Sequence, residues 1–554
     1  MPSLNFKGKA LVQNFHLLVP YHELKPVKSK SLTPKVSLHD NLVVHGDNLK
    51  ALKSLLPYYH GKVKCIYIDP PYNTGNEDWV YNDNVSSPMI QEWLGKVVDR
   101  EDLTRHDKWL CMMMPRLKLL REFLTEDGVI FVSIDDAEIH RLRCLMDEVF
   151  AEANFLTTFV RKRRLSTGMR DQPVSPDHEY VVAYAYALDR VDLFGTKRRA
   201  EDYPFEDGKG RYRSTDLTVG MGKELRPNQY YAISEPGTKR EYWPPETRVW
   251  RFEPRTMAGE IEAGNIIWPS TTPGGRMTRP RYKTRFSPDE LSENPVSTWI
   301  EGPATAGDLA DDVTVLRSGL NQEATRELRE IGLEGEFAYP KPVSLVRSLV
   351  DLATKGDSIV LDCFSGTGTT GQAVLAANQD DGGARHFVLI EDGDFAHSIT
   401  AERIRRVIKG VPKAKDEALQ KGLGGSFSFI EIGHPMRLEA MLKAEELPSY
   451  EDLAGYIFYT ATGEDFDARQ INRKTGFIGE SAQYDVYLLY EPSLDYLKST
   501  ALTLDVARHL PKGSGKKRLV FAPTKYLDSI HLDEHRIEFC QLPFEIYKAA
   551  KPKR

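Results

Sequence analysis

The chain of 554 residues predicts an α/β fold with a parallel sheet, because short apolar runs alternate with stretches of helical period. This alternation occurs in two separate parts of the chain, and a long segment without helical period divides them. A chain of this length exceeds one ordinary core, so we expect two or three domains.

The first α/β part spans residues 41–154. Its expected elements are a strand from about Leu42, a helix carrying Leu49, Leu52 and Leu55, a strand over Val63–Ile68, a helix over about Asp107–Leu124, a buried strand over Val129–Ile134 and a helix from Asp135 to about Phe150. Strands that alternate with helices in this way indicate a parallel sheet. Residues 1–40 show few periodic signals and are interpreted as an N-terminal arm.

The second α/β part spans residues 313–410. Its expected elements are helices over about Gln322–Ile331 and Pro342–Thr354, a strand over Ser358–Asp362, a helix over Thr369–Asn378 and a strand over Arg385–Glu391. Residues 155–312, between the two parts, are rich in Pro, Gly, Arg, Tyr and Trp, which favours a separate domain that is mainly β or irregular. Residues 411–554 begin with a Lys/Gly-rich linker and continue as a mixed α+β region.

The composition is that of a soluble globular protein, with 41% hydrophobic and 28% charged residues. Neither an apolar run of membrane-spanning length nor an export signal is found, so we expect a cytoplasmic protein without membrane contact. The five cysteines are widely scattered and form no Cys-x-x-Cys pair. We therefore expect free thiols and no metal site.

The net charge of −6 is unevenly distributed along the chain. Residues 155–290 carry 24 Lys and Arg against 19 Asp and Glu, a net charge of +5, which leaves −11 for the remainder. A basic middle segment in an acidic protein points to one positively charged surface that suits a polyanion.

The tetrapeptide Asp69-Pro70-Pro71-Tyr72 closes the strand over Val63–Ile68 and suits a flat heterocycle with an exocyclic amine. The Asp69 carboxylate is a charged acceptor, and the prolines lack a backbone N–H, so they offer only carbonyl acceptors. Tyr72 offers an aromatic face for stacking. A helix cap or turn is the simpler alternative for Asp69, but the adjoining prolines and tyrosine favour a role in binding an amine.

A second motif, Asp362-Cys363-Phe364-Ser365-Gly366-Thr367-Gly368, follows another apolar strand and opens a helix. Its two glycines permit a tight turn and the close approach of a ligand to the backbone. Glu391 ends the next strand, where a carboxylate suits both hydroxyls of a ribose. Together with Gly371 the glycines also fit the dinucleotide fingerprint, which leaves NAD binding as an alternative; Phe364 and the tetrapeptide favour a different nucleoside.

With these two motifs the chain resembles the amino-methyltransferases of DNA, in which a Phe-x-Gly-x-Gly motif binds S-adenosylmethionine and an Asp/Asn/Ser-Pro-Pro-Tyr motif holds the target amine. The catalytic motif comes first here, which is the order of the β group of that family. Further motifs are similar to those of modification (Mod) subunits of type III restriction–modification systems: Asn73-Thr74-Gly75, Phe131–Asp136, Tyr339-Pro340-Lys341-Pro342 and Glu538–Phe544.

The resemblance implies a Rossmann-like, AdoMet-dependent methyltransferase sheet assembled from both halves, with residues 155–312 as the target-recognition domain. It also implies that Asp69 and the Pro70 carbonyl, with Pro71 beside them, accept the two hydrogens of a flipped-out adenine, on which Tyr72 stacks. Cytosine N4 is the competing target, and Asp rather than Ser at position 69 favours adenine.

For the methyl donor, the resemblance implies a site lined by Asp362, Phe364, Gly366 and Gly368, with Glu391 at the ribose. Lys341 is expected either near the methionine carboxylate or as a solvated lysine at a helix start. Asp47 is expected either to face the same cleft or to cap the following helix.

Basic residues of the middle segment are the expected phosphate contacts, with solvated charge as the alternative for each. They are Arg161, Lys162, Arg163, Arg164, Arg276, Arg279 and Arg281. The implied partners are double-stranded DNA, a second copy of the chain and an ATP-dependent helicase–nuclease (Res) subunit, since the chain lacks a phosphate-binding loop of its own. Two alternatives stay open: a stand-alone methyltransferase, or a chain that acts chiefly as the DNA-recognition subunit of a nuclease assembly.

Overall fold

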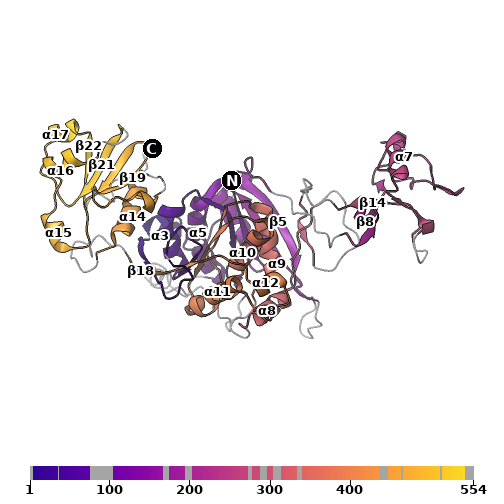
Figure 1. The fold of residues 1–554 in the computed structure, drawn as a ribbon, viewed down its shortest axis with the longest axis horizontal. Coiled ribbons are helices and arrows are strands. Elements are labelled where there is room, and N and C mark those ends of the chain that lie inside the picture. The colour runs from indigo at the N-terminus through magenta and orange to yellow at the C-terminus, as the bar shows by residue number, and fades with distance from the viewer. Residues whose placement is uncertain are drawn as a thin grey trace. The chain divides into compact units, whose positions relative to one another are not determined.

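The computed structural model describes residues 4–34, 36–74, 104–165, 174–193, 203–271, 277–286, 296–302, 314–333, 340–435, 447–462, 464, 466–511 and 515–542. The chain divides into two compact units. The first comprises Met1–Leu193 and Arg317–Arg554, and the second comprises Phe194–Leu316. Figure 1 shows the elements in chain order.

The first unit is built on a large mixed sheet in which strands from the two α/β parts interleave. Within this unit the strand order is β1 (His22–Pro26), β18 (Ser428–Pro435), β2 (Leu42–His45), β17 (His386–Glu391), β16 (Ile359–Asp362), β3 (Val63–Ile68), β4 (Leu124–Ile134), β6 (His178–Ala185) and β5 (Phe155–Lys162). The strands predicted over Val63–Ile68 and Ser358–Asp362 are confirmed as β3 and β16, which lie side by side.

The five central strands, β2, β17, β16, β3 and β4, run parallel to their neighbours. Glu391 at the end of β17 pairs with His45 at the end of β2, and Asp362 at the end of β16 pairs with Leu389. The carboxyl ends of these strands therefore share one edge of the sheet. Ligands of open α/β sheets bind at that edge.

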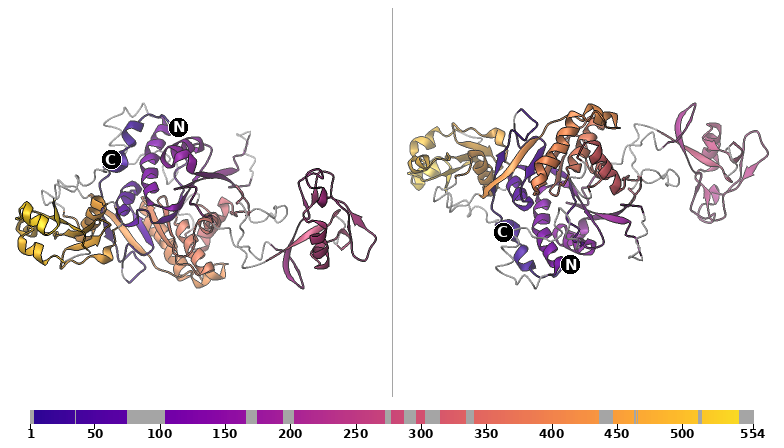
Figure 2. Two further views of the ribbon diagram at one scale, coloured as in Figure 1. Left: turned by 90° about the horizontal axis from the view of Figure 1, so that it is seen from above. Right: turned by 90° about the horizontal axis from the view of Figure 1, so that it is seen from below.

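Helices cover both faces of the sheet, as the two views of Figure 2 show. The helices of this core are α1 (Lys9–Val12), α2 (Phe15–Leu18), α3 (Asn48–Tyr59), α5 (Arg105–Phe123), α6 (Ile139–Met146), α8 (Asn321–Glu330), α9 (Val343–Ala353), α10 (Thr369–Asp381), α11 (Glu402–Lys409) and α12 (Glu417–Lys421). Because successive strand residues point to opposite faces, each strand contributes to two cores.

The alternation in β17 illustrates this division. Ile390 belongs to the same buried cluster as Leu117 of α5, whereas the adjacent Leu389 faces α10. A Cβ added to Gly371 of α10 would lie 3.0 Å from Leu389 Cδ1 and 2.5 Å from Ile404 Cδ1 of α11. The absence of a side chain at Gly371 thus lets α10 approach both the sheet and α11 closely.

Local signals in the sequence explain where two of the helices start. Thr104 accepts a hydrogen bond from the Asp107 backbone N–H, and the Asp107 side chain accepts one from the Thr104 N–H, which forms a capping box at the start of α5. Asp47 accepts a bond from the Lys50 N–H at 3.0 Å and caps α3.

The second unit contains a small antiparallel sheet in the order β13 (Ile266–Ile267), β14 (Arg281–Arg285), β8 (Gly210–Asp216) and β7 (Phe205–Asp207), as well as α7 (Pro254–Glu262). Its short strands also include β9 (Thr218–Val219), β10 (Ile233–Ser234), β11 (Glu241–Tyr242), β12 (Val249–Trp250) and β15 (Trp299–Ile300). Trp250 and Trp268 are buried in its core, whereas Trp243 is exposed.

The C-terminal region has a second mixed sheet in the order β19 (Phe477–Glu480), β20 (Tyr484–Leu488), β21 (Lys517–Ala522) and β22 (Ile537–Gln541). Its helices are α14 (Tyr450–Thr462), α15 (Leu494–Ser499), α16 (Leu504–His509) and α17 (Ser529–Glu534). Both helices and strands are thus present where the sequence predicted an α+β region.

Three predicted boundaries differ from the observed elements. Residues 1–40 are not a free arm, because β1 pairs with β18 and extends the sheet. The separate C-terminal region does not begin at residue 411, because β18 (Ser428–Pro435) pairs with β2 in the large sheet. The inserted domain does not begin at residue 155, because β5 and β6 pair with each other and β6 pairs with β4.

No helix among the described residues is long and apolar enough to cross a membrane.

Candidate active site

The Asp69-Pro70-Pro71-Tyr72 corner directly follows β3, at the edge of the sheet where the parallel strands end. The Asp69 side chain is 24% exposed, and Tyr72 is buried. Burial raises the pKa of Asp69 and the nearby Glu179 acts in the same direction, whereas Lys341 lowers it. The corner thus presents a carboxylate whose ionisation depends on the charges around it.

Two buried contacts fix the backbone of this corner. The Trp109 indole Nε1–H of α5 donates to the Pro71 carbonyl at 2.7 Å. Asn73, whose φ is +58°, donates from Nδ2 to Glu138 Oε1 at 2.5 Å. The Trp109 bond thus orients the Pro71 carbonyl and the adjoining backbone, which carries the Pro70 carbonyl expected to accept from the amine.

The second motif forms a tight turn between β16 and α10. The Asp362 carboxylate accepts bonds from the Phe364 N–H at 3.0 Å and the Thr370 hydroxyl at 2.5 Å. Burial raises the pKa of Asp362 to about 7. Gly366 and Gly368 have φ values of +50° and +80°, in the left-handed region that glycine adopts without strain.

Glu391 binds this turn from the neighbouring strand. Its Oε2 accepts from the Gly366 N–H at 2.7 Å, and its Oε1 accepts from the Gly393 N–H at 3.0 Å. A carboxylate at the end of β17, beside the glycine turn, suits the hydroxyls of a ribose. The Ser365 hydroxyl is buried without a hydrogen-bond partner among the described residues. A tight glycine turn with a buried, unsatisfied hydroxyl fits a nucleoside ligand.

Two residues predicted at the donor site are placed differently. Lys341 Nζ lies 2.7 Å and 2.8 Å from the two Asp69 carboxylate oxygens, so in this structure its partner is the Asp69 corner. Asp47 caps α3, which is the simpler of its two expected roles, and its Oδ2 lies 3.7 Å from Arg116 Nη2.

The prediction that Arg161 contacts DNA is wrong. Its side chain is fully buried, forms an ion pair with Glu179 at 2.7 Å and donates to the Ser318 hydroxyl at 2.6 Å. It also donates to Asn321. Because strand residues alternate between faces, Arg161 points inward in β5 while Lys162 is exposed.

The other predicted phosphate contacts have varied surroundings. Arg163 and Arg164 are partly exposed, and each lies beside the segment around Asp177. Arg279 is exposed, whereas Arg281 donates to the hydroxyl and carbonyl oxygens of Ser214. Arg276 lies outside the described residues.

Trp109, Glu138 and Glu179 were not identified from the sequence. Each contacts the Asp69 corner, or a residue bound to it, from an element distant in the chain. A tryptophan inside an apolar helix and a glutamate at a helix start are common structural features. Neither has a local sequence signal of its own.

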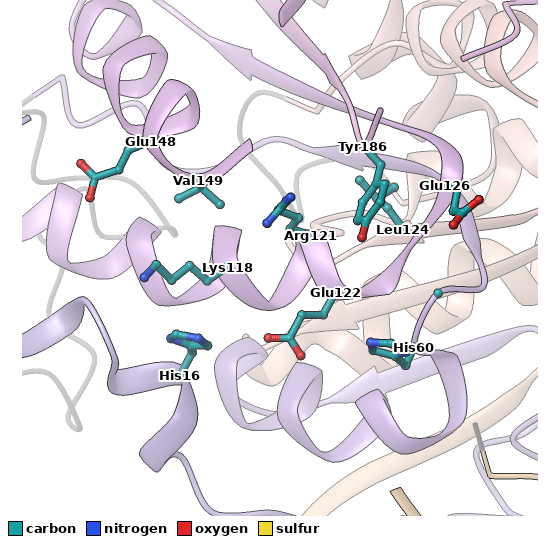
Figure 3. Close-up of a pocket in the computed structure, with 11 residues that line it drawn as sticks. His16, His60, Lys118, Arg121, Glu122, Leu124, Glu126, Glu148, Val149 and Tyr186 are labelled. Atoms are coloured by element: carbon teal, nitrogen blue, oxygen red, sulfur yellow. The ribbon is translucent and has the colours of Figure 1, made fainter. Parts of the chain in front are cut away.

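A cavity of about 560 Å³ lies at the opposite edge of the sheet, where β3 and β4 begin. Figure 3 shows His16, Lys118, Arg121, Glu122 and Tyr186 among the side chains around it. Burial raises the pKa of Glu122, and burial with nearby lysines lowers that of His16 to about 4. None of the predicted site residues lines this cavity.

Among the described residues, no group of three or more His, Cys, Asp or Glu side chains is placed to hold a metal ion.

The family model for DNA methylase matches residues 63–402, which include both motifs and the elements between them. The chain belongs to the DNA methylase family. Its large α/β sheet is therefore a methyltransferase sheet, and its methyl donor is S-adenosylmethionine.

Curated relatives extend this likeness. The chain is 29% identical over 468 residues to the type III restriction–modification enzyme StyLTI Mod subunit of Salmonella typhimurium, covering 78% of this chain and 66% of the relative. It is 29% identical over 474 residues to the EcoPI Mod subunit of Escherichia phage P1, covering 76% and 70%. The chain thus spans about two thirds of the length of these relatives. It is also 29% identical to the type II methyltransferase M.KpnI of Klebsiella pneumoniae, in a match that covers 70% of this chain and 88% of the relative.

Solved structures of DNA methyltransferases align with the chain at low identity. PvuII DNA methyltransferase, which is cytosine-N4-specific, aligns with a TM-score of 0.33 and 11% identity, covering 66% of this chain and 86% of that one. The M1.HpyAVI–SAM complex aligns with a TM-score of 0.28 and 11% identity, and the alignment covers 66% of this chain and 98% of that one.

Proposed function

We propose that this chain is the modification subunit of a type III restriction–modification system and methylates N6 of adenine in double-stranded DNA. The observation that carries the proposal is the arrangement of β3 and β16. These adjacent parallel strands bring the Asp69 corner and the Asp362 turn to the same edge of the sheet. An amine acceptor beside a nucleoside-binding turn is what methyl transfer to a base requires.

The catalytic role of the corner follows from the chemistry of the amine. The lone pair of an adenine amine is delocalised into the ring, so acceptors for both N–H groups return electron density to nitrogen. In the proposed complex Asp69 accepts one hydrogen and the Pro70 carbonyl accepts the other. Tyr72 stacks on the flipped base, and the Trp109 bond orients the Pro71 carbonyl and the adjoining backbone.

The donor site is proposed to use Asp362, Phe364, Gly366, Gly368 and Glu391. When bound, S-adenosylmethionine would supply an electrophilic methyl group to the amine nitrogen, and its sulfur would keep the electron pair of the broken carbon–sulfur bond. The proton that the methylated nitrogen gives up would pass to solvent water. The turn holds the nucleoside, and Glu391 holds the turn through the Gly366 N–H. Positioning at the edge of the sheet then supplies much of the rate acceleration.

DNA contacts and partners complete the proposal. Lys162, Arg163, Arg164 and Arg279 are the retained candidates for phosphate contacts, together with Arg276 and Arg281. We also propose that the chain acts in the cytoplasm as a homodimer that assembles with an ATP-dependent helicase–nuclease subunit. The likeness to the two Mod subunits supports these assignments.

A second candidate is a stand-alone methyltransferase. The specific observation in its favour is the likeness to M.KpnI, which the match covers over 88% of its length. Both candidates use the same corner and the same donor. They differ in whether the chain assembles with a nuclease subunit.

The test is to incubate the full chain with DNA and S-adenosylmethionine labelled in its methyl group, and to identify the modified nucleoside by mass spectrometry. We expect label only in N6-methyladenosine of the DNA. Label in N4-methylcytosine would contradict the adenine assignment, and absence of label would contradict the activity. Co-purification with the product of a neighbouring nuclease gene distinguishes the modification subunit from the stand-alone enzyme.

A further inference from the structure

Lys341 occupies the position at Asp69 that the proposed function reserves for the substrate. Its ammonium donates to both carboxylate oxygens, at 2.7 Å and 2.8 Å, and lies 4.7 Å from the centre of the Tyr72 ring. The ammonium thus makes the contacts that an exocyclic amine on a stacked base would make. Because the ammonium lies against both oxygens, an incoming amine has to displace it or share these acceptors with it.

Glu179 of β6 offers Lys341 a second partner. Its carboxylate is 1% exposed and lies 3.9 Å from Lys341 Nζ. The other cation at Glu179 is Arg161, at 2.7 Å, and Arg161 is held in place by Ser318 and Asn321. Glu179 is therefore a fixed negative charge within a short side-chain movement of Lys341.

We propose that Lys341 is a placeholder for the target amine: it holds Asp69 while no base is bound and shifts toward Glu179 when the flipped base arrives. This inference rests on the proposed function of Asp69. Before the shift each of the two carboxylates has a cation beside it, Lys341 at Asp69 and Arg161 at Glu179. The Lys341 ammonium lies next to a carboxylate in both positions, so the shift does not isolate a buried cation.

The placeholder has two consequences for catalysis. Without DNA, the lysine orients the Asp69 carboxylate and lowers its pKa against the effect of burial. With the base in place, positive charge develops on the amine nitrogen, and withdrawal of the ammonium leaves the negative charge of Asp69 to stabilise it. Lys341 is accordingly a positioning residue for this reaction.

The test compares DNA duplexes that differ only in the amine. One carries adenine at the methylated position and the other carries purine, which has no exocyclic amine. The ratio of the two dissociation constants measures how much the amine contributes to binding. If Lys341 competes with the amine, Lys341→Met raises this preference for adenine by about tenfold. In the variant the amine gains its hydrogen bond to Asp69 without first breaking the bond between Lys341 and Asp69.

Lys64→Met is the matched control. Lys64 Nζ also pairs with an aspartate, Asp127, at 2.6 Å, and it lies near the start of β3 rather than after its end. This variant should leave the preference for adenine unchanged. An unchanged or lower preference in Lys341→Met would overturn the placeholder, and a weaker affinity for S-adenosylmethionine alone would assign Lys341 to the donor instead.

A second variant tests the role of Glu179 independently. Glu179→Gln removes the alternative partner, so kcat/KM should fall in the presence of Lys341 and change little in the Lys341→Met background. Equal losses in both backgrounds would contradict the shift toward Glu179. Formation of N6-methyladenosine by the unaltered protein is measured first, so a failed proposed function is recognised before the variants are interpreted.

Discussion

At the scale of single residues, the Asp69 corner depends on a hydrogen bond from outside it. The Trp109 N–H donates to the Pro71 carbonyl, and Trp109 is fully buried. Removing this donor leaves a carbonyl unsatisfied next to the acceptors of the target amine. A buried unsatisfied carbonyl costs about 1–3 kcal/mol.

Trp109→Phe should therefore lower kcat by about tenfold. Misplaced acceptors would raise the activation free energy by about 1.4 kcal/mol, which corresponds to that factor. The measurement is steady-state methylation of DNA, together with thermal unfolding of the variant. Tyr490→Phe is the matched control, since its buried hydroxyl donates to the Pro448 carbonyl at 2.8 Å away from the corner. A loss of kcat in the control as large as in Trp109→Phe would contradict a specific role for Trp109.

The sequence predicted site residues that belong to short local motifs, but it did not predict residues that contact these motifs from distant parts of the chain. Asp69, Asp362 and Glu391 were predicted as site residues because each ends or directly follows an apolar strand. Trp109 and Glu138 were missed because they lie 38 and 65 residues from their partners in the corner. Only the fold reveals such pairs.

The error at Arg161 has a different physical origin. Four consecutive basic residues were read as one exposed group, although β5 places alternate residues on opposite faces. The burial of Phe159 and the partial exposure of Val160 continue the same alternation. Period-two patterning, applied through to Lys162, would have separated Arg161 from its neighbours.

At the scale of elements, strand existence was predictable and strand adjacency was not. The apolar runs identified β3, β4, β16 and β17, because buried parallel strands are apolar on both faces. The order of these strands in the sheet depends on which face of the sheet each connecting helix covers. The sequence of a single strand does not contain that information. For the same reason β1 was assigned to an arm and β18 to a separate C-terminal region, although they extend one edge of the sheet.

At the scale of the whole molecule, the division into two units separates the predicted chemistry from the predicted recognition. Both motifs lie in the first unit, and Phe194–Leu316 form the second. Replacing this unit with that of a homologue that methylates a different site should transfer the homologue's site and leave N6-methyladenosine as the product. Sequencing of methylated DNA provides the readout. Continued methylation of the original site would contradict a recognition role for Phe194–Leu316.

The central claim is that the Asp69 carboxylate activates the target amine. The most direct measurement is single-turnover methyl transfer by Asp69→Ala, with DNA affinity measured on the same preparation. We predict a loss of at least about a hundredfold in the methylation rate, as for removal of one stabilising group at a reaction centre, with DNA affinity largely retained. Methylation at an undiminished rate would contradict the claim, as would the joint loss of methylation and DNA binding.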